Sequence, residues 1–241
     1  MKLINLIKCH LSYLLSKSSI ISIILVSIIL FIVYITNAIS NTNSILKETI
    51  NNYYVSSLTI TKIIYCILSC FMMSMFYLDK NDAYISLIIV SGIKKKTYYL
   101  TKLSSILFIL FINIIILCLL FFLSGFIFIK GFVYDARFIK AFICIYILAI
   151  IYSLYANTLV IITHNMFIFL IPSLLSILST SIAQGEINTI KKIIFIFAPV
   201  TTNSLNKLYY DIYINLIIII LLTIINLLIY QSTDKRLEWA F

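Results

Sequence analysis

Long apolar runs separated by short polar segments dominate this chain. Six runs have the length, about 20 residues, that a helix needs to cross the roughly 30 Å hydrocarbon core of a bilayer. The pattern therefore predicts six transmembrane helices within a single transmembrane domain, residues 1–241. The predicted spans are Ser19–Ile39, Ser57–Leu78, Leu103–Ile129, Ala141–Thr163, Met166–Ala183 and Ile212–Tyr230.

The segment before the first span, residues 1–18, has a different pattern. Apolar side chains recur on one side of a helix at Leu3, Ile7, Leu11 and Leu14, and Lys2, Lys8 and Lys17 lie elsewhere. This pattern predicts an amphipathic helix that lies in the membrane interface. A cleaved signal peptide is the alternative, but its apolar region would be too long and no small-residue cleavage site follows Ile39.

Two further positions qualify the prediction of spans. Ile193–Val200 is apolar but too short to cross, so we expect a re-entrant segment or an interfacial helix before the sixth span. Lys62 is the charged residue of the second span, and we expect it near one end, with its ammonium group reaching the headgroups. At mid-membrane a lysine would cost roughly 3 kcal/mol of insertion free energy.

Composition supports the membrane interpretation. Hydrophobic residues make up 63% of the chain and charged residues 11%, against about 45–50% and about a quarter in soluble domains. This excludes an ordinary cytosolic enzyme, a secreted disulfide scaffold and a disordered chain. Only 4 glycines and 2 prolines are present, too few turn residues for a β-barrel. The predicted class is an all-α membrane protein.

Charge gives an expected orientation. The N-terminus, the segment between spans two and three, and the C-terminus together carry ten Lys and Arg residues, and the opposite side carries seven. The positive-inside rule therefore places both termini in the cytoplasm. Because the basic residues sit in short inter-span segments, the net charge of +10 indicates contact with membrane lipids and no nucleic acid. The usage of Ile, Lys, Asn, Tyr and Phe is typical of a low-GC bacterium, and the expected location is its plasma membrane.

The motifs of catalysis are absent from the sequence. There is no G-x-x-x-x-G-K-[ST] phosphate loop, no H-E-x-x-H and no G-x-S-x-G. No acidic residue falls inside a predicted span, so a proton carrier is also missing. Cys66 and Cys70 are four residues apart and could share a metal, but small side chains of a membrane helix are the better interpretation. We expect no enzyme activity, no catalytic residue, no metal and no cofactor on this chain.

Polar residues within or between the spans have two interpretations each. Asn113, Asn215 and Asn226 lie in spans and are expected to hydrogen-bond across helices, or alternatively to line a translocation path. His164 and Asn165 separate spans four and five. They are expected to complete a tight turn at the interface, and the alternative is a pH-sensitive hinge.

The segment between spans two and three is the most informative. Asp79 and Asp82 provide N-capping side chains for a short apolar helix, Ala83–Val90, which ends at Ser91-Gly92. One face of this helix carries Tyr84, Leu87, Ile88 and Ser91. A helix this apolar and too short to span is expected to bury itself in a groove on a partner protein. A helix lying in the headgroups is the alternative.

In this layout the chain resembles the permease subunits of type-2 ABC exporters, of the small bacterial kind that exports or clears peptides and bacteriocins. Those permeases share an interfacial N-terminal helix, six spans, a cytoplasmic coupling helix between spans two and three, a short turn between spans four and five, and a re-entrant hairpin before span six. Here the loop carries Asp79 or Asp82, the helix Ala83–Val90, Ser91-Gly92, Lys94–Lys96, and Lys102 opening span three. It departs from the family in having Asp for the commoner Glu and no proline at the break.

The resemblance implies a mechanism and partners. A separate ABC ATPase subunit would bind ATP and Mg and pass its motion to the spans through the coupling helix and the short turn. Two permease chains, identical or related, are implied, and an amphipathic peptide is the expected cargo. The residues implied to couple to the ATPase are Asp79, Asp82, Tyr84, Leu87, Ile88, Ser91, Gly92, His164 and Asn165.

Three other classes of membrane protein fit the sequence less well. An intramembrane enzyme lacks catalytic residues. A vitamin-binding membrane subunit of an ABC-type importer would need small-xxx-small packing, and glycine and alanine are scarce. A stand-alone immunity or binding protein would need no coupling helix.

Overall fold

A computed structural model describes residues 2–14, 17–40, 46–77, 92–133, 136–182 and 208–233. All regular structure in these ranges is helical: α1 (Lys2–Leu14), α2 (Lys17–Ser40), α3 (Leu46–Tyr77), α5 (Lys95–Phe128), α6 (Ala136–Thr163), the 3₁₀ helix η1 (Met166–Phe169), α7 (Leu170–Ile182) and α9 (Leu208–Thr233). The all-α prediction is confirmed for these ranges. The coupling helix Ala83–Val90 and the segment Ile193–Val200 lie outside them.

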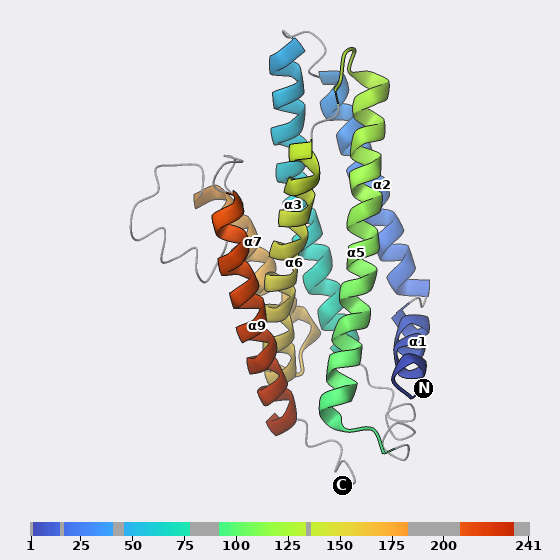
Figure 1. The fold of residues 1–241 in the computed structure, drawn as a ribbon, viewed down its shortest axis with the longest axis vertical. Coiled ribbons are helices and arrows are strands. Elements are labelled where there is room, and N and C mark those ends of the chain that lie inside the picture. Colours follow the sequence, from blue (N-terminus) through green and yellow to red (C-terminus); the bar gives the residue numbers. More distant parts are fainter. Residues whose placement is uncertain are drawn as a thin grey trace.

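The long helices form one elongated bundle, with α3 and α6 at its centre (Figure 1). α9 packs on α6, α2 packs on α5 and α3, and α1 packs on α5. The lower end of the bundle in Figure 1 holds α1, the end of α3, the start of α5, the turn after α6 and the end of α9. We call this the loop end, because the chain leaves α3 and enters α5 there.

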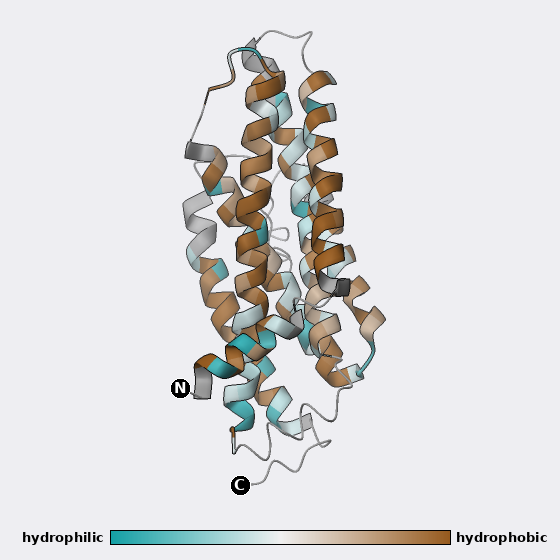
Figure 2. Cartoon of the chain, turned by 90° about the vertical axis from the view of Figure 1, so that its right-hand side faces the viewer, coloured by the Kyte–Doolittle hydropathy of each residue, from teal (hydrophilic) through white to brown (hydrophobic). Residues whose placement is uncertain are grey.

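Among the described residues, five helices have the length and apolarity to cross a membrane: Ile20–Ser40, Asn52–Tyr77, Lys95–Phe128, Phe138–Thr163 and Tyr213–Ser232. Apolar residues cover these helices along most of their length, and hydrophilic residues concentrate in α1 and at the loop end (Figure 2). The long apolar helices are compatible with a multi-pass membrane protein.

The six predicted spans are confirmed only in part, because the fifth differs. In place of one spanning helix over Met166–Ala183, the chain forms η1 and then α7, whose 13 residues extend about 20 Å at 1.5 Å per residue. α7 rises from the loop end along only part of α6 (Figure 1). Within the described ranges it is therefore an apolar helix too short to cross.

The predicted position of Lys62 is wrong. It lies near the middle of α3 and is only 4% exposed. The expectation assumed that the span began close to Lys62, whereas the apolar stretch of α3 already begins at Asn52. The ammonium group is therefore buried among helices and does not reach a membrane surface.

The predicted helix at the N-terminus exists, but its protein-facing side differs from the expected stripe. Leu6 and His10, four residues apart, are buried against the bundle, whereas Ile7 and Leu11 are half-buried. α1 lies across the long helices near the loop end (Figure 2). One side of α1 thus packs on protein, and the neighbouring apolar stripe stays partly accessible.

Polar side chains hold the helices together in several places. Because lipid tails are as apolar as leucine, helices in a membrane associate through close packing and hydrogen bonds. Tyrosine hydroxyls supply many of these bonds here: Tyr34 to Thr61 at 2.7 Å, Tyr53 to the Phe121 carbonyl at 2.8 Å, Tyr146 to the Leu107 carbonyl at 3.0 Å, and Tyr152 to Ser179 at 2.9 Å.

Candidate functional site

The loop end brings together the described part of the predicted coupling residues. Asp79, Asp82, Tyr84, Leu87, Ile88 and Ser91 lie outside the described ranges. Gly92, His164 and Asn165 are described, and so are the two helix ends between which the loop runs, Tyr77 and Lys95. The surroundings of these helix ends therefore define the candidate site.

Gly92 adopts the left-handed backbone conformation, with φ of +69°. Glycine adopts this conformation at little cost, and it is the usual conformation of a residue that ends a helix. The conformation of Gly92 is thus one in which a helix can end, and the helix predicted before it lies outside the described ranges.

The turn between α6 and η1 is built by His164 and Asn165. His164 has a positive φ of 52°, and its amide donates to the Val160 carbonyl at 2.9 Å. The Asn165 side chain accepts a hydrogen bond from the Phe167 amide at 3.0 Å and so caps η1. Both residues are exposed, as a tight turn at the end of the bundle requires.

Lys102 lies inside a cage of aromatic rings. Its Nζ is 4.6 Å from the ring centroid of Phe76, 5.0 Å from that of Tyr77 and 5.5 Å from that of Tyr98. The side chain is 4% exposed. Aromatic faces attract cations most strongly where water is excluded. Lys102 thus joins the end of α3 to the first turns of α5.

His10 of α1 packs against the same rings. Its ring centroid is 6.0 Å from that of Phe76 and 5.1 Å from that of Tyr98, both edge-to-face. His10 is 1% exposed. Burial, and secondarily the charge of Lys102, lower the pKa of His10 to about 4. The imidazole is therefore neutral at pH 7, and it attaches α1 to the cage.

A second group of rings joins α3, α5 and α9. The ring centroids of Tyr77 and Tyr99 are 5.5 Å apart, and that of Tyr230 lies 5.2 Å from Tyr99 and 6.3 Å from Tyr77. The Tyr77 hydroxyl donates to the Tyr99 carbonyl at 3.3 Å. From α6, the Asn157 side chain donates to the Tyr99 hydroxyl at 3.0 Å. These contacts connect four helices.

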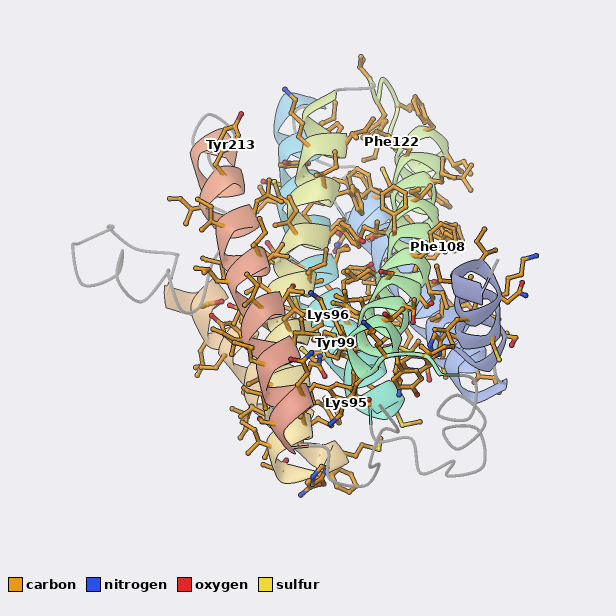
Figure 3. The ribbon with its side chains drawn as sticks, turned by 60° about the horizontal axis from the view of Figure 1, so that its bottom comes forward. Lys95, Lys96, Tyr99, Phe108, Phe122 and Tyr213 are labelled. Carbon is orange, nitrogen blue, oxygen red and sulfur yellow. The ribbon has the colours of Figure 1, made fainter. Side chains whose placement is uncertain are left out.

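Lys95 connects the first turn of α5 to the last turns of α9. Its Nζ donates to the Gln231 carbonyl at 3.1 Å and lies 5.7 Å from the Tyr230 ring centroid. A cation at the C-terminal end of a helix interacts favourably with the carbonyl dipoles there. Figure 3 shows Lys95, Lys96 and Tyr99 near the loop end, with Tyr213 at the far end of α9.

Together these residues form what we call the aromatic–lysine cluster: His10, Phe76, Tyr77, Lys95, Tyr98, Tyr99, Lys102, Asn157 and Tyr230. It includes the last two residues before the loop and the first turns after it. Because buried rings and hydrogen bonds join the members, a displacement of either loop end would be transmitted to α1, α6 and α9.

The three asparagines named as candidates for a translocation path are not brought together by any contact among the described residues. Asn113 donates to Ser27 of α2 at 3.1 Å. Asn226 accepts from Thr158 at 2.7 Å and donates to the Leu154 carbonyl at 3.0 Å, both on α6. Asn215 is 8% exposed on α9. Asn113 and Asn226 thus make the cross-helix hydrogen bonds expected of them.

No metal centre is formed by the described residues. No group of three His, Cys, Asp or Glu side chains meets the geometry that a metal needs. Cys66 and Cys70 are free and fully buried in α3.

Sequence reasoning missed the cluster and the burial of Lys62. One signal was present: aromatic pairs occur at both loop ends, Phe76-Tyr77 and Tyr98-Tyr99, where membrane proteins concentrate aromatic side chains. The pattern does not say that these rings enclose Lys102, because that depends on how α3 and α5 pack.

The comparisons with known proteins add no relationship. No protein-family model matches the chain, and no curated protein gives a significant match. The helices alone therefore classify it: it is an all-helical chain over the described ranges, with five helices long and apolar enough to cross a membrane.

Proposed function

We propose that this chain is the membrane-spanning subunit of an ATP-driven exporter whose ATPase is a separate protein. The observation that carries the proposal is the aromatic–lysine cluster, which joins both ends of the loop over residues 78–91 to α1, α6 and α9. A loop that receives force from a partner needs such a connection, since rigid-body motion is transmitted through packed contacts.

The sequence adds the reason for a partner. The chain has no phosphate-binding loop, so ATP and Mg would be bound by the ATPase subunit. The apolar helix expected at Ala83–Val90 would bind a groove of that subunit. The exposed turn at His164 and Asn165 lies at the same end of the bundle (Figure 1) and would form a second contact.

The outer helices support a pair of permease chains. α2 and α9 expose many of their apolar side chains; Ile217 and Ile220, for example, are 58% and 60% exposed. Lipid covers such faces, and a second chain, identical or related, would cover part of them. The proposed cargo is an amphipathic peptide, and the proposed location is a bacterial plasma membrane with both termini in the cytoplasm.

Copurification tests the proposal. The tagged protein is expressed with an ATPase encoded by a neighbouring gene, and both are reconstituted in lipid vesicles. We expect the ATPase to copurify and its ATP hydrolysis to depend on the permease chain. An ATPase variant lacking its phosphate-loop lysine is the control and should bind without hydrolysis. ATP hydrolysis by the purified permease chain alone would contradict the proposal.

A further inference from the structure

Lys62 is a buried cation in the apolar stretch of α3. It lies 10 residues from Asn52 and 15 from Tyr77, the ends of that stretch, which is about 15 Å and 22 Å along the helix axis. A lysine side chain is too short to reach either end. With 4% of its surface exposed, the side chain is enclosed by protein.

The neighbours of Lys62 on the same face of α3 indicate which helices this face packs against. Cys66 follows at the i+4 position and Cys70 at i+8, and both are fully buried. Ser69, the residue before Cys70, donates to the Ala149 carbonyl of α6 at 3.1 Å. Cys70 lies beside Ser173 of α7. The part of the stripe at Cys66 and Cys70 therefore faces α6 and the short helix α7, and Lys62 lies one turn before Cys66.

No anion balances Lys62 within the part of the chain that the structure describes. Neither a hydrogen bond nor an ion pair to its ammonium group is found there, in contrast to the ring-enclosed Lys102. The apolar stretches of the five long helices contain no Asp or Glu. An ionisable side chain inside a membrane is costly and commonly marks a substrate or ion pathway.

Small polar side chains line the adjoining face of α7. Ser173, Ser176 and Ser179 are 3%, 1% and 1% exposed, and Ser179 meets the Tyr152 hydroxyl of α6 at 2.9 Å. Small residues let helices approach closely without interlocking side chains. The surface between α3, α6 and α7 thus combines one unbalanced cation with hydroxyl and thiol groups in an apolar surrounding.

We propose that Lys62 binds the anionic group, a carboxylate or a phosphate, of an amphipathic ligand whose apolar part lies between α3, α6 and α7. As a statement about the transported substrate this rests on the proposed function. As a statement about binding it stands on the packing of α3, α6 and α7, whatever the transported substrate.

A binding measurement without any ATPase tests the site. The full chain, in nanodiscs of phosphatidylcholine, is titrated with 11-(dansylamino)undecanoic acid and with the primary amide of the same probe, followed by dansyl fluorescence. The acid should bind at least about tenfold more tightly than the amide, the effect of one charge-assisted hydrogen bond. Lys62→Gln should abolish this preference, and Lys62→Arg should keep it. Lys130→Gln, a change of an exposed lysine in the turn after α5, should leave it unchanged.

The variants also separate binding from folding. Lys62→Met removes a buried charge, so this variant should fold, with a thermal midpoint no lower than that of the unaltered protein, and should bind acid and amide alike. Equal binding of acid and amide by the unaltered protein, or an acid preference that survives in Lys62→Gln, would overturn the proposal. Neither result would bear on copurification with an ATPase, so the two proposals fail separately.

Competition against the bound acid identifies the source of the anion. Displacement by phosphatidylglycerol, but not by phosphatidylcholine, would indicate a lipid phosphate. Displacement by an amphipathic peptide with a free C-terminus, but not by its amidated form, would indicate a peptide carboxylate.

Discussion

Lys102 and Lys62 are both 4% exposed, yet their surroundings differ. Lys102 lies over three aromatic rings, and desolvated cation–π contacts contribute about 2 kcal/mol. Lys62 has thiol and hydroxyl neighbours on its own helix and no ring contact among the described residues. The first lysine is thus stabilised by its packing and holds helices together, whereas the second faces no anion among the residues that the structure describes.

His10 makes the packing of α1 on the bundle depend on pH. Its pKa is about 4 when α1 is packed on the bundle, because of burial and then the charge of Lys102, and about 6.5 when α1 is released into water. The released state therefore binds the proton more readily. Packing of α1 is fully stable above pH 6.5 and weakens as the pH falls from 6.5 towards 4, by about 30-fold at pH 5.

A nitroxide on the exposed Cys9 measures this effect. Its mobile spectral component should grow below pH 6 in the unaltered protein. In the variant His10→Phe, which keeps a ring against Phe76 and Tyr98 but cannot be protonated, mobility should not change with pH. If the mobile component of the unaltered protein did not change with pH, His10 would not be buried against the rings of Phe76 and Tyr98.

At the scale of elements, contacts with the long helices determine where α1 and α7 lie: α1 packs on α5, and α7 packs on α3 and α6. α1 turns Leu6 and His10 to the protein, although its apolar periodicity centres on the neighbouring stripe. α7 has one apolar face and one face of buried serines, and it spans 13 residues within the described ranges. Both helices meet the bundle near the loop end, where a partner would bind.

The coupling helix expected at Ala83–Val90 gives a second prediction. Burying a Leu-sized side chain contributes about 1.5–3 kcal/mol, so Leu87→Asp with Ile88→Asp should remove two such contacts and place two charges against an apolar groove. Stimulation of the ATPase should collapse and the complex should dissociate more easily. Insertion should survive, because no span is altered.

The matched control is Lys47→Ala, a change near the start of α3 at the opposite end of the bundle, which should leave coupling intact. Normal assembly and transport by the Leu87/Ile88 double variant would contradict the coupling-helix assignment.

At the scale of the whole molecule, the helix ends fall into two groups. α3 and α6 both end at the loop end, and α5 begins there (Figure 1). With 32 residues, α3 separates its two ends by about 48 Å, more than a bilayer core. A helix of this length can cross a bilayer core, so the proposed topology places the basic residues before and after α3 on opposite sides of the membrane.

Site-directed labelling checks this topology. In a variant without native cysteines, single cysteines replace Lys96, Arg236, Lys47, Arg137 or Lys191 in turn. A membrane-impermeant maleimide applied to whole cells should label the last three and should reach the first two only after permeabilisation. Labelling of positions 47 and 96 from the same side would exclude the proposed arrangement.

The sequence by itself determined the membrane class, the helices and most of their positions. The reason is that a backbone in lipid must satisfy its own hydrogen bonds, so a long apolar run becomes a helix whatever surrounds it. The turn at His164 and Asn165 was likewise predictable from the sequence, because hydrogen bonds between residues close in the chain form it. The tertiary structure alone decided that α7 is separate from α6 and short within the described ranges, that Lys62 lies deep in α3 and that Lys102 is enclosed by rings. Those outcomes depend on which helix faces are brought together, and packing between segments distant in sequence leaves no local pattern.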